Sequence, residues 1–306
     1  MTNPQLSAAP ALSRAHRPLG ANLTFDGVLR AALALAFGFA CIIVLVVAFV
    51  ILQGAAPALA QISWARFLTD PDWHPMVEMY NMTPMLVGSV LTSIGALVLA
   101  TPVSLAIAAA CNFYLNPLAA SIYRRILFVM AAMPTVIFGF WGLTEVVPFL
   151  GQIKAPGVSL LAGVLILALM IIPTTALLID VAFSKLPRQL LNGAYALGAS
   201  RAQTCFTMAC VVVRRAIFSA ALLGLGRALG ETIVVVMVTG NKAALPTSIF
   251  DPIRTLTANV TLEIGYAAPL HTATLFLSIL ILFMIATGLA LLVYKLNFND
   301  NTQVDV

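Results

Sequence analysis

Residues Ala31–Leu52 read AALALAFGFACIIVLVVAFVIL, a run of 22 residues without one charged side chain. The hydrocarbon core of a bilayer is about 30 Å thick, so a helix that crosses it needs about 20 mostly apolar residues. Five further runs of comparable length follow: Leu86–Ala110, Ile126–Thr144, Ala155–Ile179, Ala216–Gly240 and, from about His271 onward, a run within Ile264–Tyr294. The pattern predicts an all-α integral membrane protein with six transmembrane helices.

The composition excludes most soluble classes of protein. Of the 306 residues, 61% are hydrophobic and 9% are charged, and the mean hydropathy is +1.02. An average globular protein is about half apolar and about a quarter charged. A water-soluble fold of this size has too little interior to bury that much apolar surface. A soluble enzyme, a disordered tail and a nucleic-acid-binding module are therefore excluded, although the net charge is +5.

The positive charges flank the apolar runs and indicate their orientation, because Lys and Arg concentrate in short cytoplasmic loops. With six spans both termini share one side, which holds eleven of these residues: Arg14, Arg17, Arg30, Arg124, Arg125, Lys185, Arg188, Arg201, Arg214, Arg215 and Lys295. The other side holds four: Arg66, Lys154, Lys242 and Arg254. We therefore expect cytoplasmic tails at 1–30 and 297–306, a six-span domain at 31–296 and a cytoplasmic segment at about 181–214.

The fifth run contains the most informative stretch, GLGRALGET at Gly224–Thr232. Arg227 lies twelve residues beyond Arg215, or about 18 Å along a helix, which places it near the middle of the bilayer. Inserting an arginine there costs at least about 2.5–3.5 kcal/mol. With their i,i+4 spacing, Arg227 and Glu231 are predicted to share one helix face and to neutralise each other partly.

Two interpretations of this pair stay open. It is either an internal salt bridge that joins two helices, or a polar site on a transport path where the guanidinium binds an oxyanion. The second is favoured, because desolvating both ions can cost more than their attraction returns. Gly226 and Gly230 are also spaced i,i+4 and predict the close approach of another helix. The glycines do not form a nucleotide loop, since no strand precedes them and no Gly-Lys-Ser/Thr follows.

The cytoplasmic segment is longer than a minimal connection between helices. Its residues Leu190–Phe206 read LLNGAYALGASRAQTCF, which predicts two short helices with a turn at Gly198. Exposed Tyr195 and Phe206 favour a docking surface for a soluble partner. The alternative is an interfacial helix pair without a partner.

Three further expectations concern single residues. Trp64 and Trp73, between the first and second runs, are expected at the level of the lipid headgroups. Asp180 ends the fourth run and is expected to be solvated at the membrane boundary. The spacing of the cysteines and histidines matches no metal site and no disulfide framework: Cys41, Cys111, Cys205 and Cys210, with three histidines far apart.

These residues resemble the type I class of ABC importer permeases and, more closely, the C-type permease subunits of phosphate-specific transporters. Three features carry the resemblance: AAMPTVIFGFWGL at Ala131–Leu143, the stretch Gly224–Thr232, and the order of the spans with a cytoplasmic segment after the fourth. The resemblance covers about residues 28–296. The arginine and the glutamate in the fifth span are its most specific mark.

The resemblance implies a type I permease core that forms half of the path of an ATP-driven importer of inorganic phosphate. It implies a multi-pass subunit of the bacterial inner membrane that is not itself an enzyme and binds no cofactor and no nucleic acid. The implied partners are a homologous A-type permease subunit, a dimer of ATP-binding subunits that hold ATP and Mg, an extracytoplasmic phosphate-binding protein and the lipid bilayer. The implied substrate path is Arg227, Glu231 and Thr135, and the implied ATPase-docking residues are Asn192, Gly193, Ala194, Gly198 and Phe206.

The cytoplasmic segment departs from the class pattern of Glu-Ala-Ala, three residues, Gly and a later Leu-Pro. Aligned on Gly198, this chain has Asn192-Gly193-Ala194 in place of Glu-Ala-Ala, and the expected Leu-Pro falls at about Cys210-Val211. Two alternatives therefore stay open: a signalling or scaffold subunit with weakened coupling, and an importer of another oxyanion such as sulfate. Protonation separates the oxyanions, because monohydrogen phosphate can donate a hydrogen bond to Glu231 and sulfate cannot.

Overall fold

A computed structural model describes residues 20–301, and nearly all of the regular structure is helical. The long helices are α1 (Gly20–Gln61), α3 (Thr83–Ala109), α7 (Leu160–Ser184), α11 (Arg214–Gly230) and α14 (Pro269–Asn301). The short helices are α2 (Arg66–Thr69), α4 (Pro117–Ala132), α5 (Thr135–Trp141), α6 (Val147–Ile153), α8 (Arg188–Ala196), α9 (Arg201–Gln203), α10 (Cys210–Val212), α12 (Ile233–Val238) and α13 (Leu256–Glu263). The remaining elements are the π-helical turns η2 (Ala110–Tyr114), η3 (Gly142–Val146) and η4 (Thr204–Ala209), and a hairpin of β1 (Trp73–His74) and β2 (Met79–Tyr80) around the 3₁₀ turn η1 (Pro75–Val77).

The chain divides into two units after Val50. The first unit is the N-terminal part of α1, whose large apolar side chains between Val28 and Val50 are exposed. A helix that is apolar on all sides, and whose apolar side chains are not packed against other protein, is typical of a segment that faces lipid. The second unit begins at Ile51 and holds every element described below.

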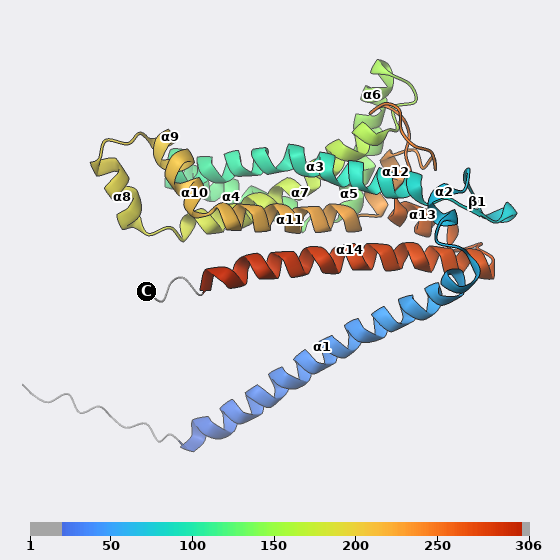
Figure 1. Cartoon of the computed structure of the whole chain (residues 1–306). Helices are drawn as coiled ribbons and strands as arrows, with labels where there is room; N and C mark the ends of the chain where they lie inside the picture. The colour runs from blue at the N-terminus through green and yellow to red at the C-terminus, as the bar shows by residue number, and fades with distance from the viewer. Residues whose placement is uncertain (1–19, 302–306) are drawn as a thin grey trace, which may run out of the picture. The chain divides into compact units, whose positions relative to one another are not determined.

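Four helices of the second unit pack along one another. Helix α3 lies against α7, α11 contacts both of them, and α14 lies along α11 (Figure 1). Small residues allow this approach: a Cβ atom at Gly95 would lie 2.8 Å from Val164 Cγ2 on α7. Leaving lipid gives apolar helices little free energy, so close packing of this kind is what holds them together.

The predicted all-helical membrane fold is confirmed, with five or six candidate spans where six were predicted. Within residues 20–301, five helices are long and apolar enough to cross a membrane. The count becomes six if the pair Arg201–Val212 and Arg214–Gly230, bent by 73°, forms one span. The bend lies at the junction of α10 and α11, where the segment at about 181–214 turns into the fifth predicted span.

The third predicted span is wrong in its limits. A helix over Ile126–Thr144 would have to continue through Pro134, which lacks a backbone N–H and disfavours a helical residue before it. Helix α4 ends at Ala132, and Met133 is extended, with φ −64° and ψ 137°. The helix long enough to span begins afresh at Thr135 and runs to Ile153 through α5, η3 and α6.

The hairpin before α3 corrects the expectation for Trp73. Its side chain is 5% exposed, and its Nε1 donates a hydrogen bond to Glu263 Oε2 at 2.8 Å. Trp73 is therefore part of the protein interior and not a headgroup anchor. Trp64 is 62% exposed, as a residue that meets lipid headgroups would be.

Asp180 is also not solvated as expected. It is buried, and Arg124 of α4 binds it through Nε at 2.8 Å and Nη2 at 2.9 Å. Asn112 Nδ2 donates a third hydrogen bond at 2.7 Å. The charge is thus paired inside the protein, and it joins α4 and η2 to α7.

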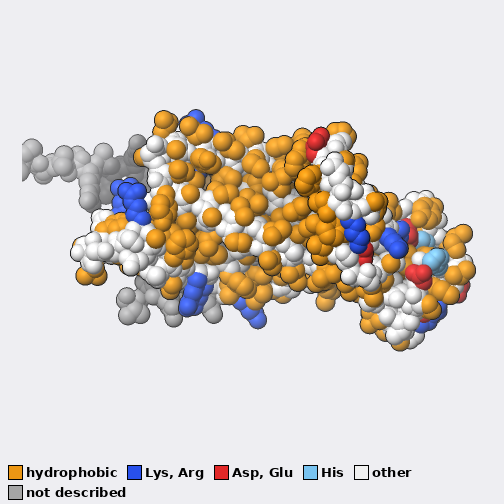
Figure 2. Space-filling model, turned by 90° about the horizontal axis from the view of Figure 1, so that it is seen from above, with side chains coloured by type: hydrophobic (Ala, Val, Ile, Leu, Met, Phe, Trp, Pro, Cys, Tyr) orange, Lys and Arg blue, Asp and Glu red, His pale blue; other side chains and the backbone are white. Residues whose placement is uncertain are grey.

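Charged side chains are unevenly distributed over the molecule. On the face drawn in Figure 2, Asp and Glu lie toward the end that holds β1, and the end that holds α8 shows only Lys and Arg. This asymmetry agrees with the positive charge assigned to the cytoplasmic side.

Candidate functional site

The predicted fifth helix over Ala216–Gly240 is broken at Glu231. Helix α11 ends at Gly230, Glu231 has the extended angles φ −72° and ψ 129°, and α12 begins at Ile233. The expectation that Arg227 and Glu231 share one helix face is therefore wrong. Non-helical backbone inside a membrane protein is tolerated where protein or a water-lined cavity satisfies the freed polar groups.

The polar groups at the break are satisfied by neighbouring residues. Thr257 of α13 donates a hydrogen bond from Oγ1 to the carbonyl oxygen of Glu231 at 3.0 Å. The Glu231 carboxylate turns toward α12 and accepts a hydrogen bond from the Val234 N–H at 3.3 Å. One carboxylate of the predicted pair thus caps a helix instead of pairing with Arg227.

Arg227 lies in the last turn of α11 and is half-buried. Among residues 20–301 its guanidinium has no hydrogen bond and no ion pair. At spacings of four and three residues, Leu223 and Gly230 lie on the same side of α11, and both are exposed. This side of α11 carries a cation that the described part of the chain leaves available to another molecule.

Thr135 lies at the level of the break. A Cβ at Gly139 would meet Val234, and one at Gly142 would meet Val238, so α5 and α12 run side by side in the same direction. Thr135 precedes Gly139 by one turn and is therefore level with the end of α11. Thr135 therefore lies near the break at Glu231, and no hydrogen bond joins it to Arg227 or Glu231 within residues 20–301.

Gly226 and Gly230 do not have the predicted role of allowing another helix to approach closely. Gly226 and Gly230 line an apolar crevice of about 240 Å³ between α11 and α14. In the described part of the chain, a Cβ at either would meet nothing within 4 Å, so neither permits a close helix approach. That role belongs to Gly224, where a Cβ would lie 2.9 Å from Thr175 Oγ1 of α7.

The cytoplasmic segment has the two predicted helices and the glycine turn. Helix α8 ends at Ala196, α9 begins at Arg201, and Gly198 between them has φ +81°, a conformation that glycine adopts without a steric penalty. Ser200 and Gln203 form a capping box that fixes the start of α9.

The three predicted docking residues that belong to α8 lie on two sides of this helix. Gly193 and Ala194 line a groove of about 500 Å³ together with Leu190, Leu197 and the residues that follow Gly198. Asn192 faces a second groove of about 410 Å³ whose lining includes Arg188 and Arg201. Phe206 is 55% exposed and lines neither groove.

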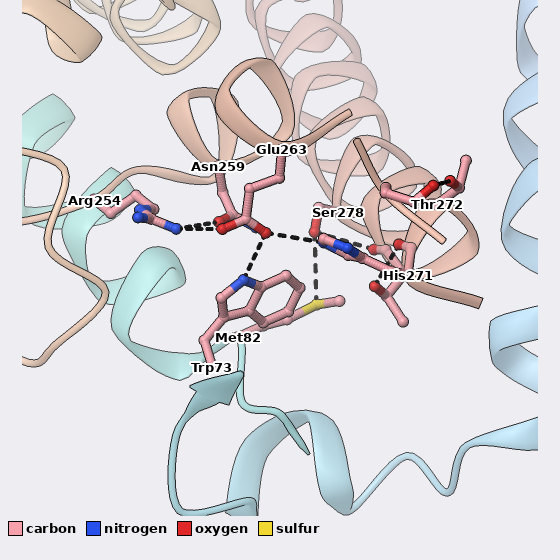
Figure 3. A network of polar contacts seen from close by, with 10 residues as sticks. Trp73, Met82, Arg254, Asn259, Glu263, His271, Thr272 and Ser278 are labelled. Atoms are coloured by element: carbon pink, nitrogen blue, oxygen red, sulfur yellow. Dashed lines mark hydrogen bonds and ion pairs between the residues drawn. The ribbon is translucent and has the colours of Figure 1, made fainter. Parts of the chain in front are cut away.

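Sequence reasoning missed a polar network at the other end of the molecule. Glu263, the last residue of α13, accepts hydrogen bonds from Arg254 Nη1 at 2.6 Å, His271 Nε2 at 2.9 Å and Trp73 Nε1 (Figure 3). Arg254 also donates to Asn259 Oδ1 at 3.0 Å. Trp73 and Glu263 are 190 positions apart, so no local spacing indicates that they meet.

Comparison with known proteins agrees with this architecture. Residues 100–296 match the family described as the binding-protein-dependent transport system inner membrane component. The chain is 31% identical over 271 residues to the phosphate transport system permease protein PstC of Pasteurella multocida, covering 78% of this chain and 83% of that protein. It is 35% identical over 209 residues to the probable ABC transporter permease protein YqgH of Bacillus subtilis, covering 67% and 68%.

A solved structure shares the fold. The crystal structure of a bacterial alginate ABC transporter, in complex with its alginate-bound periplasmic protein, aligns with a TM-score of 0.62. The alignment covers 90% of this chain and 96% of that chain at 14% identity.

Proposed function

We propose that this chain, which belongs to the family of inner membrane components of binding-protein-dependent transport systems, carries inorganic phosphate as its solute. Membership makes the chain a non-catalytic, multi-pass permease subunit of an ABC importer, a class that works with an ATPase and a binding protein. Relatives that transport phosphate cover most of the chain at about 30% identity. The proposal thus concerns the solute and the residues that contact it.

The unpartnered guanidinium of Arg227 carries the proposal. A helix that ends at Gly230 places this cation beside non-helical backbone, where a path for a polar solute can pass. A planar guanidinium binds two oxygens of a phosphate at once. Thr135, near the break, adds a hydroxyl that can donate to a third oxygen.

Glu231 supports selection of phosphate over sulfate. One of its oxygens accepts from Val234, and the carboxylate has further lone pairs. Monohydrogen phosphate can donate a hydrogen bond to such an acceptor, whereas fully ionised sulfate has no hydrogen to donate. The carboxylate also limits how tightly Arg227 holds an anion, which release into the cytoplasm requires.

The remaining assignments follow from this role. The chain pairs with a homologous A-type subunit, a phosphate-binding protein docks on the end that holds β1, and ATP and Mg are bound by a dimer of partner subunits. Both termini are cytoplasmic, and the six-span domain covers residues 31–296. The segment at about 181–214 docks the ATPase through Asn192, Gly193, Ala194, Gly198 and Phe206.

One experiment tests the solute. The full complex is reconstituted in proteoliposomes, and ATP-dependent uptake of labelled phosphate is measured with and without excess sulfate. Uptake that sulfate does not reduce supports phosphate. Uptake that sulfate abolishes indicates a general oxyanion importer, and an assembled complex whose ATPase does not respond to the binding protein indicates the signalling or scaffold role.

A further inference from the structure

A cavity of about 420 Å³ lies between the β1–β2 hairpin and the segment that joins α13 to α14. Its lining includes Trp73, Glu78, Tyr80, Glu263, Tyr266 and His271. The rings of Trp73, Tyr80 and Tyr266 and two carboxylates thus line one space. The hairpin beside it lies at the end of the second unit opposite to α8 (Figure 1). None of these residues belongs to the proposed solute path.

The hydroxyl of Tyr80 is available to a ligand. The Tyr80 side chain is 2% exposed, yet among residues 20–301 its hydroxyl makes no hydrogen bond. The oxygen atom of this hydroxyl still has some contact with solvent. A buried tyrosine normally finds a hydrogen-bond partner, so this hydroxyl is free to bond to a ligand that enters the cavity.

The net charge of the cavity is negative. Glu263 is balanced by Arg254 at 2.6 Å, but the Glu78 carboxylate has no ion pair with any described residue. Burial raises the pKa of the Tyr80 hydroxyl and the negative charge of Glu78 raises it further, while Arg66 lowers it, so the phenol stays neutral and its oxygen can accept a hydrogen bond. A negative site lined by aromatic rings is suited to a cation.

The backbone holds Glu78 in place at a conformational cost. Glu78 has φ +57°, in the left-handed region that residues other than glycine seldom adopt. Its carbonyl oxygen accepts a hydrogen bond from Arg66 Nη2, and its N–H donates to Pro75 O at 3.1 Å. The hairpin therefore fixes the backbone of Glu78 beside the cavity.

The rim of the cavity has the composition of a protein interface. Met76 is 97% exposed and Tyr266 is 71% exposed, and both line the cavity. Methionine and tyrosine are enriched at the centres of interfaces, where a pocket accepts one anchoring side chain of the partner. A partner protein thus fits the rim better than a free cation does.

We propose that this cavity receives one lysine or arginine side chain of the solute-binding protein. The inference rests on the proposed function only for the external position of the hairpin, and it does not depend on phosphate as the solute. In the docked complex the cation pairs with Glu78, donates to the Tyr80 hydroxyl and packs against the rings of Trp73 and Tyr266.

The test measures the affinity of the solute-binding protein encoded with this permease for the complete transporter. The complex is held in nanodiscs without ATP, and the dissociation constant is obtained by biolayer interferometry at low and high salt. Glu78→Gln is expected to weaken binding at least about tenfold at low salt, and Tyr80→Phe by about threefold or more. The double variant should lose less than the product of the single losses, because both groups contact one cation.

The matched control is Asp72→Asn. Asp72 lies on the same hairpin, pairs with His74 at 3.5 Å and does not line the cavity, so its loss should change the dissociation constant less than about twofold. Parental affinity for Glu78→Gln overturns the proposal, as does tighter binding by Glu78→Lys. Glu78 is exposed, so Glu78→Gln still decides the matter if Tyr80→Phe does not fold. A transporter of another solute would still bind its own binding protein here, which separates this test from the uptake assay.

Discussion

The hydroxyl of Thr257 lies 3.0 Å from the carbonyl oxygen of Glu231 and donates a hydrogen bond to it. This contact joins the first turn of α13 to the break between α11 and α12. The last residue of the same short helix, Glu263, binds Trp73 and His271. Helix α13 therefore connects the proposed solute site to the cavity beside the β1–β2 hairpin.

Loss of the Thr257 hydroxyl should impair transport. Thr257→Val leaves the Glu231 carbonyl without this donor, and a hydrogen bond of this kind is worth about 0.5–1.5 kcal/mol. We expect phosphate uptake to fall about two- to tenfold, and Thr257→Ser to retain the parental rate. Thr261→Val removes an exposed hydroxyl one turn later and serves as control. Equal rates for Thr257→Val and Thr261→Val would show that the contact has no role in transport.

Asp180→Asn should destabilise the protein strongly. The change leaves Arg124 without its ion-pair partner, and breaking a buried pair costs about 3–5 kcal/mol. Thermal unfolding in detergent measures the effect, with the exposed Glu145→Gln as control. The double variant Arg124→Leu, Asp180→Leu should be more stable than Asp180→Asn, because it leaves no buried charge. A melting temperature of Asp180→Asn equal to that of the control would contradict the ion-pair assignment.

Gly198→Ala should uncouple the ATPase. A side chain at φ +81° strains the backbone by about 1–2 kcal/mol, and relief of this strain changes the angle between α8 and α9. We expect less stimulation of ATP hydrolysis by the binding protein, while the complex still assembles. Gly288 is exposed and lies well inside the length of α14, so Gly288→Ala is the matched control and should keep full stimulation. Full stimulation in Gly198→Ala would argue against a role of this turn in coupling.

Asp251 should make the loop between α12 and α13 sensitive to acid. Hydrogen bonds from the Thr247 hydroxyl and the Thr247 and Ser248 N–H groups, together with Lys154, lower the pKa of Asp251 below its ordinary 3.8. A lowered pKa stabilises the fold at pH values above the ordinary one, and this contribution is lost as pH falls through the folded-state value. The difference in melting temperature between the parent and Asp251→Asn should therefore shrink below about pH 4. A difference that stays constant down to about pH 3 would contradict the assignment.

Much of the membrane fold could be predicted from the sequence because it depends on local properties. The apolar runs that became α3, α7 and α14 are set by composition over about 20 residues. The turn at Gly198 follows from one residue type between two helical patterns. The break at Pro134 had a local signal too, since proline ends a helix at the residue before it.

The details of the site could not be predicted, because they depend on contacts between distant residues. A regular helix through Gly224–Thr232 matches the spacing of Arg227 and Glu231, and only the partners Thr257 and Val234 show why the chain leaves that helix. Burial of Trp73 likewise depends on Glu263, 190 residues away. Helical spacing carries no information about either contact.

The most direct test of the central claim is ATP-dependent uptake of labelled phosphate by proteoliposomes that contain the complete complex with Arg227→Gln. The matched control is Arg125→Gln, an exposed arginine of α4 away from the break. Loss of a charged hydrogen bond to phosphate should reduce uptake by Arg227→Gln at least about tenfold, with assembly intact and the control near the parental rate. An assembled Arg227→Gln complex that takes up phosphate as fast as the Arg125→Gln control would contradict the claim that Arg227 binds the transported anion.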